Sequence, residues 1–381
     1  MNQFNFLNKL LDIEPDGSPF LSVYLNTEPN ETGKKDFDIF LRKQISEHGA
    51  VIDPTSDEKK HFDAAADRIN DFLGKIDASI RGVAIFASAG PNGFFDTFEF
   101  QVPVEENNFF SFDKPHIYPL VRLMEQHPTF AVAAADTNSA FVYTFRRGRV
   151  LGKDEIQNVK TNRSEVGGWS QMRYQRHIDN FHQQHAKEVV GELEKLVRDE
   201  RTETVVIVGD STVIVPMLLA EMSQELKEKI AATLSMNVNT PEHELLEAAD
   251  QAVRDHDAAG DKERIEYLFE HNYDDGIGVV GVDKTLAALL NGQVQELYVT
   301  ANLDDITYDR DSVRNVLTDY APGTDGEVAD AAERAMLVDE LIKQAARSAD
   351  KVRFIEDPHL LKTVGGVGAI LRYQAKGVSS V

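Results

Sequence analysis

The sequence contains no cysteine. This absence excludes disulfide bonds and thiolate metal ligands, and it gives no reason to place the chain in an oxidising compartment. The chain also lacks any run of about 18 apolar residues, and residues 1–11 lack the basic start and the apolar core of a signal peptide. These absences predict a soluble, cytoplasmic protein that has no contact with a membrane.

Basic residues are few compared with acidic ones, since 40 Lys and Arg stand against 64 Asp and Glu, for a formal net charge of -24. This balance argues against a surface that coats DNA or other nucleic acid, but it leaves room for a local basic patch. The simplest interpretation of the acidity is solubility or adaptation to a salty cytoplasm. With 381 residues and 42% hydrophobic content, the chain predicts two or three domains, each with its own core.

The order of apolar patterns predicts an α/β protein of three blocks, with limits at 1–125, 126–272 and 273–381. The first block is a mixed α/β domain that contains both strands and helices with apolar residues at helical spacing. Its predicted elements are a strand at 20–25, helices at 35–47 and 56–73, and strands at 82–87 and 94–102.

The second block predicts a three-layer α/β domain with a protruding loop. A strand pair joined by a tight turn is followed by a loop, a long helix beginning near Tyr174, and a continuous apolar run typical of a strand buried on both faces. The predicted elements are strands at 129–135, 139–145 and 150–151, a helix at 174–199, a strand at 204–209, and helices at 213–221, 225–234 and 241–271.

The third block predicts an α/β/α sandwich. A helix ends at Leu290 before Asn291 and Gly292, which is a common way to stop a helix. Strands at 296–300, 351–355 and 369–373 and a helix at 330–349 follow. The glycine-rich run at 365–368 precedes a strand and does not open a helix, so we interpret it as a turn in preference to a nucleotide site.

The stretch at 162–171 is the candidate functional loop. Gly167 and Gly168 have no Cβ, so the backbone can take positive φ and approach another molecule closely. Trp169, the only tryptophan of the chain, follows them, and Ser170 and Gln171 come next. A flexible loop of this kind with cationic flanks suits a phosphate-rich partner such as the end of an RNA.

The charge balance around this loop is the reverse of that of the whole chain. Residues 142–176 contain three acidic residues, which are Asp154, Glu155 and Glu165. The same stretch contains eight basic residues, which are Arg146, Arg147, Arg149, Lys153, Lys160, Arg163, Arg173 and Arg176. The loop therefore lies within a local basic patch.

The order of the blocks and several short stretches resemble the archaeal and eukaryotic class-one peptide release factors and their relative Pelota. The sequence is most similar to the bacterial branch of that superfamily, over essentially the whole chain. The resemblance rests on residues 21–27 (Leu-Ser-Val-Tyr-Leu-Asn-Thr), 167–171 (Gly-Gly-Trp-Ser-Gln), 173–177 (Arg-Tyr-Gln-Arg-His), 287–293 (Ala-Ala-Leu-Leu-Asn-Gly-Gln) and 297–299 (Leu-Tyr-Val).

This resemblance implies that the middle-domain loop enters the peptidyl-transferase centre of the ribosome, where the family's glutamine helps to position water beside the peptidyl-tRNA ester. Gln171 is the residue that matches. In classical factors the two glycines and the glutamine are contiguous, whereas Trp169 and Ser170 intervene here, as in the branch that includes tRNA-cleaving quality-control factors. The first block shows no counterpart of the stop-codon-reading motifs, so the resemblance implies a codon-independent rescue role.

Each site residue has a functional and a purely structural interpretation. Gly167, Gly168 and Gln171 are the candidate catalytic residues, and because a neutral amide has no useful basicity, Gln171 can only orient water or a leaving oxygen. Alternatively, Gln171 is an ordinary residue at a helix start. Trp169 either stacks on a terminal base or packs on its own domain. Arg163, Arg173 and Arg176 either contact RNA phosphates or form a solvated helix face.

Two rival sites are not supported by the spacing. At about 100° per residue, His177 and His182 lie about 140° apart on a helix, so they cannot join His185 around one metal ion. Ser170 and His177 lie about 10 Å apart on the same helix, which is too far for a nucleophile and its base. The sequence therefore predicts neither a metal site nor a bound cofactor.

The hypothesis is a ribosome-associated factor that promotes peptidyl-tRNA hydrolysis or tRNA cleavage, with the ribosome, peptidyl-tRNA and a helper GTPase as partners. The alternative is a non-catalytic ribosome or RNA adaptor of the same architecture. A third interpretation, an unrelated α/β metabolic enzyme, is weakened because no nucleotide or metal motif occurs.

Overall fold

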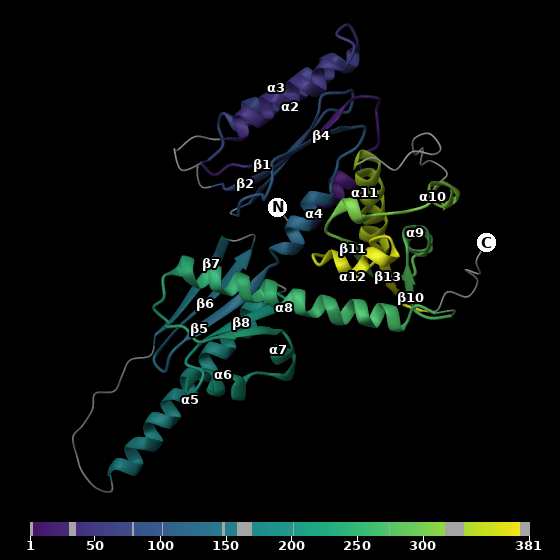
Figure 1. The fold of residues 1–381 in the computed structure, drawn as a ribbon. Helices are drawn as coiled ribbons and strands as arrows, with labels where there is room; N and C mark the ends of the chain where they lie inside the picture. The colour runs from purple at the N-terminus through teal and green to yellow at the C-terminus, as the bar shows by residue number, and fades with distance from the viewer. Residues whose placement is uncertain are drawn as a thin grey trace. The chain divides into compact units, whose positions relative to one another are not determined.

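The computed structural model describes residues 3–29, 36–77, 80–100, 102–146, 149–157, 170–200, 202–273, 275–316 and 331–373. At 3–5, 146, 149–155, 157, 170–179 and 314–316, it describes the backbone alone. The described chain forms three separate β-sheets with helices packed against them (Figure 1). This mixed α/β architecture confirms the predicted fold class and is consistent with a three-domain layout.

The first sheet has the order β3-β2-β1-β4 and is antiparallel throughout. Its strands are β1 (Phe20–Asn26), β2 (Gly82–Ser88), β3 (Phe94–Phe100) and β4 (Asn108–Phe112). Helices α2 (Phe37–Ala50) and α3 (Asp57–Leu73) share a core with one face, and α1 (Gln3–Leu11) and α4 (Tyr118–Gln126) share a core with the other. Every second residue of a strand points to the same face. Accordingly, Leu21 and Val23 pack with α2 and α3, whereas Phe20 and Tyr24 pack on the opposite side.

The middle sheet has the order β7-β6-β5-β8-β9. Its strands are β5 (Phe130–Ala135), β6 (Ser139–Arg146), β7 (Arg149–Gln157), β8 (Thr204–Gly209) and β9 (Ile230–Leu234). Strands β5, β8 and β9 are parallel, and the β5–β6–β7 meander is antiparallel. Helices α5 (Ser170–Asp199), α6 (Ile214–Glu221) and α7 (Gln224–Glu228) belong to this part of the chain, as does the first part of α8 (Glu242–Glu270).

Both faces of the middle sheet are covered, as expected for a three-layer domain. On β5, Ala131 and Ala133 face α5 and α6, while Phe130 and Val132 face α8. Because alanine side chains are short, they let α5 lie close to the sheet, and the larger residues of the other face fill the space under α8.

The third sheet has the order β10-β13-β11-β12. Its strands are β10 (Gly278–Val280), β11 (Val294–Thr300), β12 (Lys351–Ile355) and β13 (Val367–Leu371), and the helices around it are α9 (Val282–Leu290), α10 (Arg310–Val316), α11 (Ala331–Ser348) and α12 (Pro358–Leu361), with short 3-10 turns at Leu303–Asp305 and Lys362–Val364. The turn predicted at 365–368 is confirmed for Gly365 and Gly366, but residues 367 and 368 already belong to β13, so the strand predicted at 369–373 lies at 367–371. Gly365 and Gly366 have φ of 79° and 78°, and a Cβ on Gly365 would lie 2.6 Å from the Thr307 carbonyl oxygen.

Two compact units divide the chain. One unit contains Met1–Glu125 together with Gly260–Val381, and the other contains Gln126–Ala259. In the first unit, a single hydrophobic core contains Tyr24 and Phe86 of the N-terminal sheet as well as Leu286, Leu341 and Phe354 of the C-terminal block. The first and last blocks therefore share a core, which corrects the prediction of one core for each domain. The predicted limits of three domains remain a prediction.

Several predicted elements need correction. The helix predicted at 225–234 is wrong, because the chain forms the short α7 and then β9, whose Ile230 pairs with Val205 of β8. The strand predicted at 150–151 extends from Arg149 to Gln157. Helices α1, α4, α10 and α12 and strands β4 and β10 were not predicted. In the part of the chain that the structure describes, no helix has the length and the apolar content to span a membrane.

Candidate functional site

The predicted functional loop, residues 162–171, overlaps the start of helix α5. Arg163, Gly167, Gly168 and Trp169 lie outside the described residues. Helix α5 begins at Ser170, so Gln171 is its second residue, and the prediction of a loop continuing to Gln171 with a helix from Tyr174 is wrong. Good helix formers at 171–173 (Gln-Met-Arg) follow a serine, a residue type that is favoured at helix starts, and this explains the earlier beginning.

Three of the predicted site residues, Gln171, Arg173 and Arg176, lie on the first two turns of α5, where the backbone alone is described. The helix brings them into one short segment. Their assigned roles therefore remain predictions.

The topology of the middle sheet determines where α5 starts. Strand β7 is parallel to β5 and β8, because β6 runs antiparallel to both β5 and β7. Gln157, at the end of β7, pairs with Ser139, so it lies at the same sheet edge as the β5–β6 turn at 136–138. Since α5 leads into β8, which begins at the opposite edge with Thr204, the helix must run back across the sheet.

Burial along α5 shows where the helix meets the sheet. His185 and Ala186 are buried, and Val189, Leu193 and Val197 continue this buried face. Residues 180–184 are half-buried or exposed. Residues 170–184, about 22 Å of helix at 1.5 Å per residue, therefore precede the packed half. In Figure 1 this first part of α5 extends beyond the sheet of its own unit.

His185 marks the point where α5 reaches the sheet edge. Its side chain is completely buried, and it hydrogen-bonds the backbone of Ser139 and Asp136 in the β5–β6 turn. Burial lowers the pKa of His185, while these hydrogen bonds and the carboxylates of Asp136 and Glu188 oppose the shift. The histidine at this position is thus a neutral anchor and not an exposed RNA-binding group.

The turn that receives His185 is held by its own hydrogen bonds. Asp136 Oδ1 accepts the backbone N–H groups of Asn138 at 2.7 Å and Ser139 at 2.8 Å, and the Asp136 N–H donates to the Ser139 carbonyl at 2.9 Å. An aspartate that closes a turn in this way restricts the backbone of the next residues. The anchor point for α5 is therefore a well-defined part of the sheet edge.

A second contact holds α5 near the same level. Gln183 Nε2 donates to Glu221 Oε1 of α6 at 3.0 Å, and Lys187 Nζ lies 3.9 Å from the other carboxylate oxygen. Sequence reasoning did not identify Glu221 or assign a role to His185 beyond the histidine pattern. The signal that could have found His185 is its place on the apolar face of a helix, but its partners come from a distant turn.

No metal centre is evident among the residues that the structure describes, since no group of three or more His, Asp or Glu has a suitable arrangement. His185 points into the domain, whereas His182 lies edge-on to the Phe181 ring at 6.1 Å. These two neighbouring histidines therefore do not face a common ligand.

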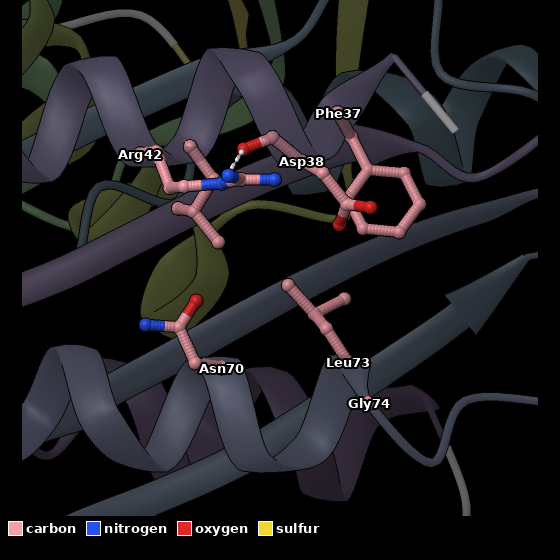
Figure 2. A pocket seen from close by; sticks show the side chains of 7 residues that line it. Phe37, Asp38, Arg42, Asn70, Leu73 and Gly74 are labelled. Carbon is pink, nitrogen blue, oxygen red and sulfur yellow. Dashed lines mark hydrogen bonds between the residues drawn. The ribbon is translucent and has the colours of Figure 1, made fainter. Parts of the chain in front are cut away.

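A separate hollow lies between α2 and α3 in the first unit and has a volume of about 420 Å³. Figure 2 shows Arg42 beside Asp38 on α2, where its Nε donates to the Asp38 carbonyl at 3.2 Å, with Asn70 and Leu73 across the hollow on α3. The lining residues are Phe37, Asp38, Leu41, Arg42, Asn70, Leu73 and Gly74. One acid, one base and apolar walls do not define a ligand class.

Two sequence-family models match adjacent parts of the chain. The model described as bacterial archaeo-eukaryotic release factor family 10 matches residues 115–254, and the model described as eRF1 domain 3 matches residues 258–375. The first match contains the predicted loop and all of α5. The two matches leave only residues 255–257 uncovered between 115 and 375.

Relatives over longer stretches include two archaeal proteins. Peptide chain release factor subunit 1 of Methanobrevibacter smithii is 23% identical over 407 residues, which cover 96% of each chain. The protein of the same name from Thermococcus kodakarensis is 22% identical over 285 residues, covering 67% of this chain and 69% of the relative.

Several solved structures are similar to this chain at low identity, and all of those described here superpose poorly on it. An archaeal translation termination factor, aRF1, has 16% identity and a TM-score of 0.26 and covers 97% of this chain and 96% of its own. Dom34 of S. cerevisiae, described as a translation termination-like factor that interacts with Hbs1, has 11% identity and a TM-score of 0.44, covering 78% of this chain and 80% of its own. Archaeal Pelota, in a ribosome-bound model with ABCE1, has 14% identity and a TM-score of 0.40, covering 98% of this chain and 95% of its own.

Proposed function

Because this chain belongs to the bacterial archaeo-eukaryotic release factors, we propose that it is a cytoplasmic, ribosome-associated release or rescue factor. It would act on ribosomes that carry peptidyl-tRNA. The observation that supports this function best is the match of the release-factor family to the segment that contains both the loop and α5. The absence of stop-codon-reading motifs in the first block favours a codon-independent role. A helper GTPase is a further proposed partner, in line with the interaction between Dom34 and Hbs1.

The proposed reaction is hydrolysis of the peptidyl-tRNA ester, or cleavage of the tRNA itself, at the loop that precedes α5. Gly167 and Gly168 would allow the backbone to approach the RNA terminus closely. The amide of Gln171 would orient water or a leaving oxygen through hydrogen bonds. Because this amide cannot act as a base, the proton would pass through hydroxyl groups of the tRNA or the ribosome.

The described helix is compatible with this role in length and charge. Residues 170–184 form about 22 Å of helix beyond the packed half of α5, which is long enough to present a loop at a distance from its domain. This segment contains Arg173 and Arg176 against the single acid Asp179, so it is weakly cationic in a chain of net charge -24. Arg163, Arg173 and Arg176 would contact phosphates, and Trp169 would stack on a terminal base.

A direct test adds the purified protein to stalled ribosomes that carry labelled peptidyl-tRNA. Wild-type protein is expected to release the peptide or to cut the tRNA, and the two products separate on a gel. Gln171→Ala is expected to lower the rate by about 100-fold or more, as does the loss of a group that acts only in the transition state. Gln184→Ala, on the same helix, is the matched control, because Gln184 is exposed and its amide donates to its neighbour Glu188.

One structural observation favours the adaptor as a second candidate. Helix α5 begins at Ser170, so Gln171 lies within its first turn and is separated from Gly168 by Trp169 and Ser170. The side chain of a glutamine within a helix has fewer allowed rotamers than that of a glutamine at the tip of a loop. Binding to stalled ribosomes with unchanged peptidyl-tRNA would support a non-catalytic adaptor and would contradict the catalytic proposal.

A further inference from the structure

Helix α5 leaves the middle domain between two contacts, which we call the collar. The collar consists of His185 bound to the β5–β6 turn and of Gln183 and Lys187 facing Glu221 of α6. All of these groups lie within the unit Gln126–Ala259. The collar stands where the buried half of α5 meets its projecting half.

The two contacts hold the helix from nearly opposite sides. At 100° per residue, Gln183 and Lys187 each lie about 160° from His185 around the helix axis, one on either side. They lie about 40° from each other, so one carboxylate can face both. The β5–β6 turn therefore supports one side of α5 and Glu221 supports the other.

The rest of the helix does not need these contacts in order to stay on the sheet. Val189, Leu193 and Val197 are buried in the core that α5 shares with β5, β8 and α6. Burial of such side chains stabilises by about 1.5–3 kcal/mol each, whereas an exposed ion pair contributes about 0–1 kcal/mol. The Glu221 side of the collar therefore restricts the direction of the helix more than it adds to its attachment.

Small changes of direction at the collar become large at the helix start. Ser170 lies about 22 Å from His185, so a tilt of roughly 10° would move it by about 4 Å. A misplacement of about 1 Å at a reacting group can lower a rate by about 100-fold. Any reacting group at the start of α5 therefore requires that the helix leave the sheet in a fixed direction.

We propose that His185 and Glu221 are positioning residues that fix the direction of residues 170–182 and so place Gln171 against its RNA substrate. This inference rests on the proposed function for its catalytic consequence. Its structural consequence is a fixed angle between the first part of α5 and the middle sheet, which we call the exit angle. This consequence is independent of whether the protein releases peptides.

The structural consequence can be measured because the chain has no cysteine. Nitroxide labels at Asn180→Cys on α5 and Thr233→Cys on β9 report the direction of the helix relative to its own sheet, and both positions are exposed. Electron–electron double resonance is expected to give one narrow distance distribution in this background. Glu221→Ala and His185→Leu should each broaden it, and Glu221→Gln, which keeps an acceptor for Gln183, should broaden it less.

Glu192→Ala is the matched control, because it removes an ion pair with Lys195 on the same helix outside the collar. It should leave the distance distribution unchanged. If His185→Leu fails to fold, Glu221→Ala decides the test, because Glu221 is a partly exposed residue at the end of α6. An unchanged distribution in Glu221→Ala would overturn the proposal.

The catalytic consequence is tested in the release assay on stalled ribosomes. Glu221→Ala should lower the maximal rate by about 10- to 100-fold with little change in the protein concentration for half-maximal rate, and Glu221→Gln should recover part of it. A broadened distribution with an unchanged rate would overturn the positioning role. If wild-type protein releases nothing while Glu221→Ala broadens the distribution, the function in release fails and the rigid exit angle stands.

Discussion

The two compact units differ in how their cores are built. In the unit Gln126–Ala259, one sheet has its own core on each face, and the residues of both cores come from this unit alone. In the other unit, the N-terminal sheet and the C-terminal block are far apart in sequence but contribute to one core. We infer that the middle unit can act as a separate module, whereas the first and last blocks form one body.

A polar contact at the seam between the first and last blocks reinforces their shared core. Asp339 of α11 accepts the His116 Nδ1–H at 2.6 Å with one oxygen and the N–H groups of Ile117 and Tyr118 at 2.9 Å and 2.8 Å with the other. The His116 side chain is completely buried, and its ring centroid lies 4.2 Å from that of Phe110. Asp339 thus caps the start of α4 from a helix more than 200 residues away in the sequence.

Replacing Asp339 by Ala should cause the largest loss of stability, and the loss should be confined to the unit formed by the first and last blocks. It leaves a buried histidine and two backbone N–H groups without their acceptor, which costs roughly 3–5 kcal/mol of unfolding free energy. Hydrogen exchange followed by segment should show lost protection in both the N-terminal and C-terminal blocks, with the middle unit unchanged. Glu340→Ala is the control, and lost protection in only one of the two blocks would contradict a shared body.

Leu193→Ala should have a comparable or slightly smaller effect in the other unit. Leu193 is completely buried between α5 and the middle sheet, so its truncation should cost about 2–5 kcal/mol. Protection should fall within residues 126–259 and persist elsewhere. Arg198→Ala, at an exposed position of the same helix, is the control. Equal loss of protection in both units would contradict an independent middle module.

Alkaline pH should lower the stability of the unit formed by the first and last blocks, through Tyr118. Burial raises the pKa of Tyr118 from 10.0 to about 12, with smaller effects of Arg122 and Glu356. Because the folded state keeps the proton that the unfolded state loses, this stabilisation is complete below pH 10 and should fall by about 1 kcal/mol between pH 10 and 11. Denaturant unfolding at these pH values measures it. Tyr118→Phe should lack this component of the pH dependence. If the unfolding free energy of the variant decreases with pH as steeply as that of the wild type, Tyr118 is not the responsible group.

Acid pH should affect the middle unit through His185, with the smallest effect. Since burial lowers the pKa of His185 below its usual 6.5, the unfolded state takes up a proton before the folded state does. Stability is therefore complete above about pH 6.5 and decreases as the pH falls below it. His185→Asn should flatten this part of the stability curve for residues 126–259. A variant curve parallel to that of the wild type would show that another group is responsible.

Much of the fold could be predicted because many elements have strong local patterns. The β-branched and aromatic residues of β1, the continuous apolar run of β8 and the amphipathic α3 all lie where their patterns predict. Element β9 was missed because Ile230–Leu234 is short and apolar, and short apolar runs do not distinguish strand from helix until a neighbour pairs with them. The long α5 was predicted, but its first four residues, 170–173, were left outside the predicted helix.

The residues of the candidate loop remain a prediction. The glycines, Trp169 and the nearby arginines stand out by composition, and the family match covers them. His185 and Glu221 could not be assigned roles from the sequence, because their partners come from the β5–β6 turn and from different helices. Spacing along one helix indicates which residues share a face, but it does not identify what that face meets.

By itself, the sequence determined the α/β class and most helices and strands, because these depend on hydrophobic period and residue type over a few turns. Only the tertiary structure decided that the first and last blocks share one core, that Asp339 caps α4, and that α5 leaves its domain between His185 and Glu221. These features depend on side chains that the chain brings together from distant positions. Such pairings are determined by packing and buried hydrogen bonds, which no local pattern encodes.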